Sequence, residues 1–150
     1  MDAVSHRLAT SGDAPRLFDV RRRSILELVT PAMSIADAVA WAGQLNLAGM
    51  EQKLRDLEIW IAEAEDVVAG WGGIRDDHLE ALYTAPEFAA QGVGAALLDR
   101  LEGLMRERGF AAARAEASPN ALAFYLRRGY RVTGRKTPVG AWPIARQLST

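Results

Sequence analysis

The chain has 150 residues, 49% of them apolar and 25% charged, which is enough to bury one core, and we expect a single domain over residues 1–150. It has no cysteine, which excludes disulfides and thiolate nucleophiles, and its two histidines form no cluster of ligand spacing, so we expect no metal site. A net charge of −1 gives no reason to expect nucleic acid or a membrane as a partner, no apolar run approaches the roughly 18 residues of a membrane span, and we expect a cytoplasmic protein.

The first part of the chain predicts a short strand followed by helices. Residues 5–10 alternate as a strand does, and residues 13–30 place apolar side chains at helical spacing up to a proline. Residues 34–37 read Ser-Ile-Ala-Asp, a pattern typical of a helix start. We expect this second helix to turn Val39 and Trp41 inward.

The middle of the chain predicts an antiparallel meander. A third helix over 47–55 precedes three strand-like runs, at 57–64, 67–75 and 78–85, which are joined by short acidic turns. The remaining predicted elements are a helix over 92–108, a strand over 110–117, a helix over 119–128 and strands over 130–137 and 141–149. This order indicates a mixed α/β (α+β) sheet flanked by helices rather than a doubly wound one.

Two glycines stand one residue apart where the third of these strands gives way to a helix, in the segment QGVG at 91–94. Glycine has no Cβ, so the amides here could approach an anion closely, and the helix would direct its positive dipole end at that anion. Ala95 and Ala96 would keep the first turn narrow, and Val93 would anchor it in the core. The segment predicts a pyrophosphate cradle, although glycines at such junctions often serve only a tight turn.

A dinucleotide-binding fold is the main competing interpretation, because Glu116 lies 24 residues after Gly92, where a ribose-binding acid could stand. However, Leu97 occupies the third small position of that fingerprint, and too little chain follows to build a nucleotide-binding sheet. We therefore set this alternative aside.

Charge is distributed unevenly along the chain. Residues 51–100 carry 4 Lys and Arg against 11 Asp and Glu, whereas residues 101–150 carry 9 against 3. The basic C-terminal third could attract an anionic ligand or could simply be solvated surface, and the sequence leaves both interpretations open.

The segment PEFAAQGVGAALL (86–98), followed by ASPNALAFYLRRGYRV (117–132), resembles the coenzyme-binding core of the GNAT superfamily of N-acetyltransferases. Members typically carry a proline near a strand end, a Gln/Arg-x-x-Gly-x-Gly/Ala loop and, downstream, an Asn, a Phe-Tyr pair and a Gly-Phe/Tyr pair. In this sequence those are Pro86, the loop 89–94, Asn120, Phe124-Tyr125 and Gly129-Tyr130. The loop begins with Ala89 rather than Gln or Arg, so a side-chain contact made there is lost while the loop amides remain.

The resemblance implies a mostly antiparallel sheet that splays between its fourth and fifth strands, with acetyl-CoA as cosubstrate in the cleft. The pantetheine arm would bond backbone groups of the fourth strand, and the pyrophosphate would meet the glycine loop and the first turn of the helix. The coenzyme contacts implied in this way are Leu82, Tyr83, Thr84, Gln91, Gly92, Val93, Gly94, Ala95, Ala96, Asn120, Phe124, Arg127 and Arg128. For the two arginines, a role as solvated helix residues is an equal alternative.

Tyr125 is the implied general acid, because a phenol with a reference pKa of about 10 is protonated at neutral pH and could give its proton to the departing thiolate. The alternative is a core aromatic beside Phe124. Asn120, which resembles a coenzyme-contacting Asn of the family, has a rival explanation as a helix-starting residue after Ser118.

A proton acceptor is also expected, because attack on a thioester requires a neutral amine. Glu80 and His78 are the candidates, since period-two alternation would put them on one strand face with Leu82 and Thr84. Glu80 is slightly preferred, and a chain of water molecules is the alternative.

The leading hypothesis is an acetyl-CoA-dependent N-acetyltransferase that moves an acetyl group to a primary amine by direct attack in a ternary complex. The acceptor, a small molecule or a protein amine, is not identified, and a homodimer is an open option. Trp41, Trp60 and Trp71 could line an acceptor pocket, although large aromatics are more often core. The competing hypothesis is a catalytically silent CoA-binding or sensory module of the same fold.

Overall fold

The computed structural model describes residues 4–148. Its strands are β1 (Ser5–Leu8), β2 (Glu58–Ala64), β3 (Val67–Arg75), β4 (His78–Thr84), β5 (Ala112–Ala117), β6 (Arg131–Val132) and β7 (Trp142–Gln147). Its helices are α1 (Ala14–Glu27), α2 (Ile35–Ala42), α3 (Leu47–Asp56), α4 (Val93–Glu107) and α5 (Leu122–Arg127), with 3-10 turns η1 (Ser11–Asp13) and η2 (Pro86–Phe88). No helix within the described residues is long and apolar enough to cross a membrane.

One seven-stranded sheet runs through the molecule in the order β1-β2-β3-β4-β5-β7-β6. Every neighbouring pair is antiparallel except β4 and β5, which confirms the predicted mixed, mostly antiparallel sheet. The predicted acidic turns join the meander β2-β3-β4, and Glu65, Asp66 and Asp76 have positive φ angles there of 48°, 65° and 56°. Asp tolerates this left-handed conformation in tight hairpins better than most residues do.

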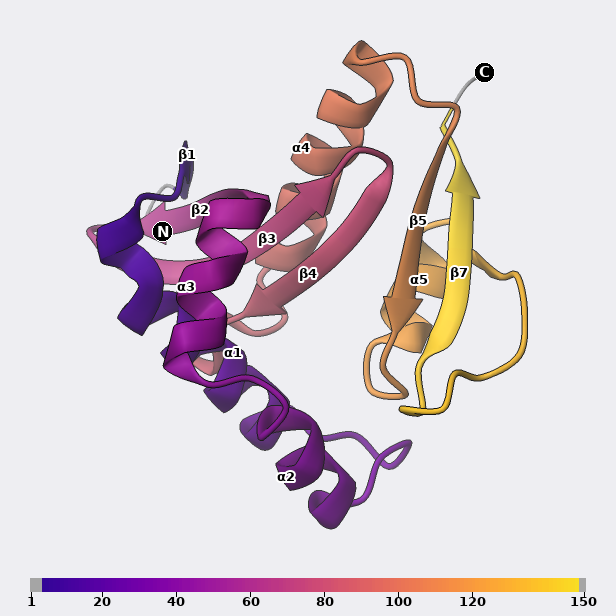
Figure 1. Ribbon diagram of the computed structural model, residues 1–150, viewed down its shortest axis with the longest axis horizontal. Helices are drawn as coiled ribbons and strands as arrows, with labels where there is room; N and C mark the ends of the chain where they lie inside the picture. Colours follow the sequence, from indigo (N-terminus) through magenta and orange to yellow (C-terminus); the bar gives the residue numbers. More distant parts are fainter. Residues whose placement is uncertain (1–3, 149–150) are drawn as a thin grey trace.

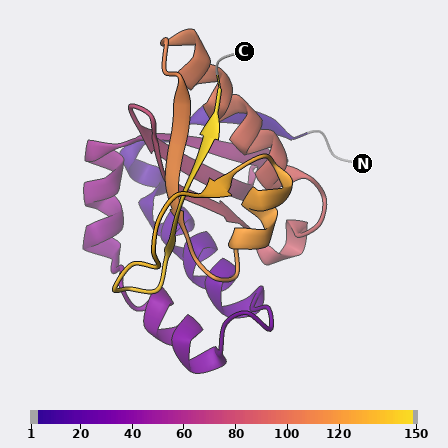
Figure 2. The same ribbon diagram turned by 90° about the vertical axis from the view of Figure 1, so that its right-hand side faces the viewer.

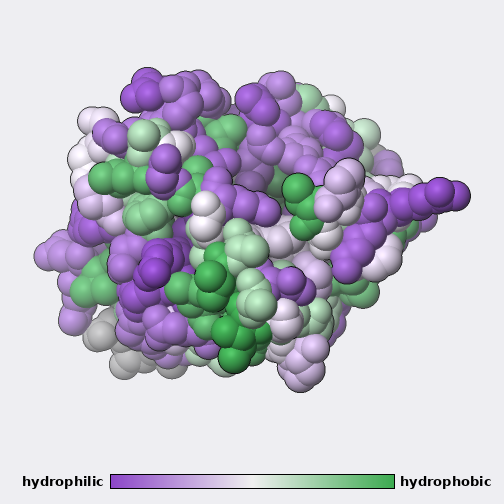
Figure 3. All heavy atoms as spheres, turned by 60° about the horizontal axis from the view of Figure 1, so that its bottom comes forward, coloured by the Kyte–Doolittle hydropathy of each residue, from purple (hydrophilic) through white to green (hydrophobic). Residues whose placement is uncertain are grey.

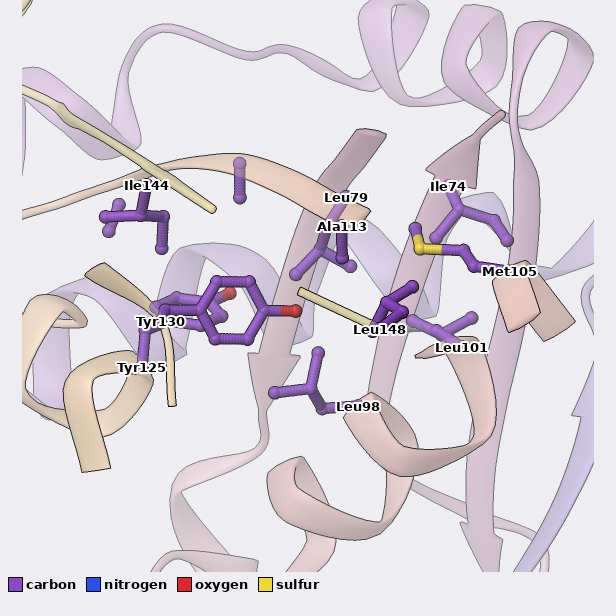
Figure 4. Packing of buried hydrophobic residues seen from close by; sticks show 12 residues of the cluster. Ile74, Leu79, Leu98, Leu101, Met105, Ala113, Tyr125, Tyr130, Ile144 and Leu148 are labelled. Carbon is purple, nitrogen blue, oxygen red and sulfur yellow. The ribbon is translucent and has the colours of Figure 1, made fainter. Parts of the chain in front are cut away.

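Helices cover the two faces of the sheet, with α1 and α3 on one face and α4 and α5 on the other (Figures 1 and 2). On the α1 face, Leu17 and Trp71 belong to one buried cluster. On the α4 face, Leu101 and Met105 belong to a second cluster that extends to β5 and β7. Figure 4 shows Tyr125 and Tyr130 together at one end of this second cluster, with Ile74 and Met105 at the other end.

The sheet splays in its middle. β4 and β5 pair only at His78 with Arg114 and at Leu79 with Ala115, whereas β5 pairs with β7 all the way from Ala112 to Ala117. Beyond Leu79 the two strands diverge (Figure 1), which agrees with the splay expected between the fourth and fifth strands. One edge of β4 therefore lacks a strand partner through most of its length.

A β-bulge in β4 interrupts the alternation of side chains, so the strand face predicted for His78 and Glu80 is wrong. Ala81 lies opposite Gly73 while Leu79 lies opposite Ile74, so Glu80 is an extra residue in the ladder. As a result Leu79 and Leu82, three residues apart, both pack on the α4 side. His78 and Glu80, which flank Leu79, therefore point to the α1 side and do not share a face with Leu82 and Thr84.

The second helix begins as predicted but packs differently. The Ser34 hydroxyl accepts a hydrogen bond of 3.0 Å from the Asp37 amide, and α2 starts at Ile35. The inward orientation expected for Val39 is wrong, because Val39 is 56% exposed and the helix instead buries Ala38 and Ala42. Figure 3 shows the end of the molecule that lies at the bottom of Figure 1, where α2 is found. Hydrophobic side chains gather on this end.

Two predicted elements near the C-terminus are shorter than expected. The helix predicted over 119–128 is α5, which starts only after a turn in which the Ser118 hydroxyl accepts from the Ala121 amide at 3.3 Å. The strand predicted over 130–137 shrinks to β6, which pairs with β7 only at Arg131 and Val132, and a tight turn in which the Thr137 carbonyl accepts from the Gly140 amide follows later in the chain. The strand predicted over 141–149 is β7, and residue 149 lies outside the described part.

Candidate functional site

A cavity of about 220 Å³ lies between the splayed strands, α1, α2 and α5. Many of its lining residues come from positions that the sequence predicted for the coenzyme. These are Leu82, Tyr83, Thr84, Gly94, Asn120 and Phe124, together with the proposed acid Tyr125. The splay thus brings residues from β4, the start of α4 and α5 to one cavity.

A second cavity, of about 80 Å³, adjoins the first near the point where β4 and β5 meet. The two cavities share wall residues, among them Leu82, Tyr125, Ile25 and Trp41. Glu80 lines the second cavity, whereas His78 lines neither. The splay therefore contains two adjoining cavities, of which the larger is lined by Gly94 of the glycine loop and the smaller by Glu80.

The glycine loop has the backbone geometry of an anion cradle. Gly92 is the N-cap of α4 with φ of 83° and ψ of 7°, and Val93 begins the helix, so a left-handed residue is followed by a right-handed one. Such a pair makes successive N–H groups converge, and the first turn of a helix leaves its N–H groups without partners in the helix. The Ala96 amide is an exception, because it donates to the Gly92 carbonyl at 3.0 Å.

The side chains of this loop stay clear of the cradle. Val93 is buried in the core, as expected, and Ala95 is half-buried. The Gln91 amide nitrogen turns back and donates to the Glu87 carbonyl at 3.2 Å. Only backbone groups and small side chains therefore remain to meet a phosphate.

Gly94 lies where the loop, β4 and α5 come closest. A Cβ at Gly94 would lie 3.2 Å from the Thr84 hydroxyl oxygen and 3.8 Å from the Phe124 ring. Because Gly94 also lines the larger cavity, a side chain there would enter that cavity.

The residues of β4 offer their backbone to the cavity rather than their side chains. Leu82, Tyr83 and Thr84 pair with β3 along one edge of the strand, while the opposite edge has no strand partner. The Tyr83 ring is occupied elsewhere, at 5.3 Å from the Trp71 ring and beneath the Arg21 guanidinium. Unpaired strand groups facing a cavity suit the amide groups of an extended ligand.

Asn120 connects α5 with the loop between α1 and α2. Its side-chain oxygen accepts from the Thr30 amide at 2.9 Å and from the Thr30 hydroxyl at 2.7 Å. Its side chain does not cap α5. The turn that precedes this helix is instead stabilised by the Ser118 hydroxyl. The Asn120 amide nitrogen makes only a long contact of 3.6 Å with the Met33 sulfur, so a donor is left at the cavity wall.

The two arginines of α5 differ in their surroundings. The Arg128 guanidinium lies over the Phe124 ring, 5.5 Å from its centroid, and the same ring approaches Gly94. Arg127 is exposed. Arg128 is thus held near the glycine loop by an aromatic face.

Tyr125 is buried in the cavity wall, with only 6% of its surface exposed. Its ring packs edge-on against Phe124 and Tyr130, at centroid distances of 5.2 and 5.3 Å. The hydroxyl makes no hydrogen bond within residues 4–148, and no fully buried side-chain polar atom there lacks a partner, so the hydroxyl reaches the cavity surface. Burial raises the pKa of Tyr125, which keeps the phenol protonated at neutral pH.

A buried carboxylate holds Tyr130, the residue against which Tyr125 packs. Glu102 of α4 is 1% exposed and accepts hydrogen bonds of 2.6 Å from the Tyr130 hydroxyl and from Arg146. Tyr130 in turn packs against Tyr125. Sequence analysis missed Glu102, although an acid beside Leu98, Leu101 and Met105 on the apolar stripe of a helix is a signal of a buried partner.

The two candidate bases form a chain of contacts. The His78 Nδ1 contacts Glu80, and its Nε2 lies 2.9 Å from a Glu116 oxygen. Glu80 also pairs with Arg75 at 2.8 Å. Glu80 is therefore the candidate that faces the cavity, and His78 lies behind it.

The tryptophans have separate roles. Trp71 is fully buried and donates to the Leu17 carbonyl at 3.0 Å, and Trp60 donates to Glu58 at 2.9 Å, so both are structural. Only Trp41 lines the two cavities. Sequence analysis missed the wall residues Ser24, Ile25, Leu28 and Met33 and gave Glu116 only a rejected ribose-binding role.

Solved structures share this fold over nearly its whole length. A GCN5-related N-acetyltransferase from Rhodopseudomonas palustris is 25% identical with a TM-score of 0.88, and the match covers 98% of this chain and 97% of that one. PaiA N-acetyltransferase from Thermoplasma acidophilum, in complex with coenzyme A, is 19% identical with a TM-score of 0.79 over 97% and 99% of the two chains. YncA from Salmonella typhimurium, with its cofactor acetyl-CoA, is 22% identical with a TM-score of 0.68 over 99% and 95%.

Sequence comparison gives the family directly. No curated protein matches the chain. A family model described as an acetyltransferase (GNAT) domain matches residues 29–140, which include the glycine loop, β4 and the Asn120 to Tyr130 segment. Because this match spans most of the chain, the protein belongs to the GNAT superfamily of acetyltransferases, whose cosubstrate is acetyl-CoA.

Proposed function

We propose that this protein transfers an acetyl group from acetyl-CoA to a primary amine by direct attack within a ternary complex. When bound, acetyl-CoA supplies the acetyl group as an activated thioester. The observation that carries the proposal is the Tyr125 hydroxyl, which is buried, protonated and without a hydrogen bond in the described residues, in a wall shared by both cavities.

The residues implied by the family resemblance receive roles that agree with their positions. The amides of Gly92, Val93, Gly94 and Ala95 would bind the pyrophosphate at the start of α4, and the free edge of β4 would bind the pantetheine arm. Gly94 supports this assignment, since a Cβ there would narrow the passage toward Thr84. Asn120 would donate its amide to the coenzyme, and Arg128 would approach a phosphate.

The proton transfers follow from the same geometry. Glu80 would accept the proton that the amine loses, directly or through water, and would be oriented by Arg75 and His78. Tyr125 would give its proton to the sulfur as the carbon–sulfur bond breaks, and solvent would reprotonate it. Glu80 and Tyr125 line the same small cavity, so the donor and the acceptor face one reacting group.

Two measurements test the proposal. Calorimetric titration with acetyl-CoA should give saturable binding at one site per chain, and coenzyme A release should appear with members of a panel of primary amines. Binding without release with any amine would favour the silent coenzyme-binding module. Absence of binding under varied pH and salt would contradict both. Light scattering of the same samples determines whether the chain is a dimer.

A further inference from the structure

The charged groups in the wall of the reaction space are all of one sign. Among the residues that line the two adjoining cavities, Glu80 and Glu116 are the only charged ones, and no Lys, Arg or His contributes to either wall. Both carboxylates belong to the smaller cavity, on the far side of Tyr125 from the glycine loop. The larger cavity, which Gly94 lines, has no charged residue in its wall, so the two cavities differ in charge.

The fold places these two carboxylates on the same side of the sheet. Ala113, Ala115 and Ala117 of β5 pack toward α4, so Glu116 points to the opposite side by alternation. The bulge turns Glu80 to that side as well. His78 lies between the two carboxylates, with its Nε2 at 2.9 and 3.1 Å from the oxygens of Glu116.

The two carboxylates are not equally available. Glu80 already contacts both Arg75 and His78. Glu116 has a single hydrogen-bonded partner, His78, within the described residues, and the nearby Arg114 is bonded to Asp77 instead. Because 45% of the Glu116 side chain is exposed, its remaining lone pairs can accept from a ligand. We therefore assign Glu116 to binding a positively charged group of the ligand, and Glu80 to accepting the proton of the reacting amine.

Independent features show that this end of the space is made to hold a ligand. The Tyr125 hydroxyl, in a side chain more than nine-tenths buried, opens into the smaller cavity without a hydrogen bond to any residue of 4–148. Trp41 and Ile25 close the same cavity from α2 and α1. The Trp41 indole likewise makes no hydrogen bond within the described chain, so its ring face and N–H remain available to a ligand.

We propose that the acceptor carries a second positive charge, as a diamine or polyamine does, and that Glu116 binds this second ammonium group while the other amine is acetylated. The inference rests on the proposed function, since it concerns the acceptor of the same reaction. A carboxylate beside an aromatic face is a suitable site for an ammonium group, and an acceptor with a carboxylate in that place would be repelled.

The test compares three acceptors of equal chain length with purified protein and acetyl-CoA: 1,4-diaminobutane, 1-aminobutane and 4-aminobutanoate. We expect kcat/KM for the diamine to exceed that for the monoamine about tenfold or more, and the aminobutanoate to be poorest. Glu116→Gln should remove most of the diamine advantage by raising its KM while leaving the monoamine within about threefold. Glu51→Gln, at an exposed position of α3, is the matched control and should leave all three unchanged.

The outcomes separate this inference from the function on which it rests. Equal kcat/KM for diamine and monoamine, or a preference for aminobutanoate, overturns the diamine proposal while acetyl transfer stands. An equal loss for diamine and monoamine in Glu116→Gln, with an unchanged melting temperature, also overturns it. Failure of every amine to release coenzyme A would instead contradict the proposed function itself.

Discussion

The two sides of the cleft differ in whether backbone groups or side chains form them. The proposed coenzyme side consists of backbone: the left-handed Gly92, the start of α4 and the free edge of β4. The proposed acceptor side consists of side chains drawn from four elements, with Ile25 from α1, Trp41 from α2, Glu80 from β4 and Glu116 from β5. A backbone site needs only the right conformation, so many sequences can form it, whereas a side-chain site changes with each substitution.

We therefore expect the side formed by backbone to be the half of the site that members of a family share. Proteins only 19% and 22% identical to this chain have its fold, and one is described with coenzyme A and the other with acetyl-CoA. The following variants test how far each side depends on backbone or on side chains, from the largest expected effect to the smallest.

Tyr125→Phe tests a hydroxyl-bearing side chain that lines both cavities. We expect turnover to fall by roughly 10²–10⁴, because a positioned general acid is lost, while acetyl-CoA affinity stays within about threefold. Phe keeps the ring that packs against Phe124 and Tyr130. Since no hydrogen bond within residues 4–148 is removed, the melting temperature should hardly change. Turnover within a few-fold of wild type would reject Tyr125 as the acid.

Asp13→Asn tests the support of the acceptor side. Asp13 is 2% exposed and accepts two hydrogen bonds of 2.9 Å from Arg7, which anchors the start of α1, the helix that supplies Ile25. We expect the free energy of unfolding at pH 7 to fall by about 2 kcal/mol, less than for a fully buried pair because Arg7 is one-third exposed.

The same pair predicts a pH dependence of stability. The Arg7 guanidinium holds the pKa of Asp13 well below its usual range, so the folded state binds this proton less readily than the unfolded chain. The contribution is present in full above about pH 4, near the pKa of Asp in an unfolded chain, and is lost as the pH falls toward the lowered pKa. Urea unfolding should therefore show the two proteins converging below pH 4. A constant difference down to pH 2 would contradict the ion pair.

Gly94→Val tests whether the coenzyme side depends on open backbone. The branched side chain would press on the Thr84 hydroxyl and Phe124, and we expect the acetyl-CoA dissociation constant to rise about tenfold or more by calorimetry. Gly103→Val is the matched control, since it makes the same change in α4 where a Cβ meets nothing within 4 Å. Equal affinity in the two variants would argue against the cradle.

Asn120→Ala and Thr30→Val test a residue that joins the two sides. Both changes remove the hydrogen bond between the Thr30 hydroxyl and Asn120, but only Asn120→Ala also removes the bond from the Thr30 amide and the amide donor at the cavity. We expect a larger loss of melting temperature in Asn120→Ala, and a dissociation constant for acetyl-CoA that is three to ten times higher in Asn120→Ala than in Thr30→Val. Equal acetyl-CoA affinities in the two variants would mean that Asn120 stabilises the loop after α1 and does not contact the coenzyme.

Arg128→Gln and Arg127→Gln should give the smallest effects. Arg128 is held over Phe124 near Gly94, whereas Arg127 is exposed, so a phosphate contact should favour Arg128. We expect acetyl-CoA affinity at low salt to fall about threefold for Arg128→Gln and less than twofold for Arg127→Gln, with the first difference vanishing at high salt. The reverse order would reassign the contact.

The fold and the left-handed turn at the glycine loop could be predicted because their signals are local. Hairpin turns, the helix start at Ser34 and the glycine loop each depend on a few neighbouring residues. The acceptor side depends on contacts distant in sequence. Glu116 acquires its place only through the pairing of β5 with β4, and Ile25 only through the packing of α1.

The misplaced side chains have physical reasons as well. Alternation along β4 failed at Glu80 because a bulge leaves no mark in a single sequence. Val39 was expected inward because it is large and apolar, yet α2 approaches its neighbours through Ala38 and Ala42, whose small size permits close packing.

The unpaired edge of β4 has a consequence for solubility. Exposed sheet edges invite strands from other molecules, and proteins commonly shield them with charges, prolines or covering loops. Here the edge from Ala81 to Thr84 lies in the walls of two cavities, to which α1, α2 and α5 also contribute side chains. These helices cover the edge, so we expect the same walls that line the ligand space to protect the protein against edge-to-edge aggregation.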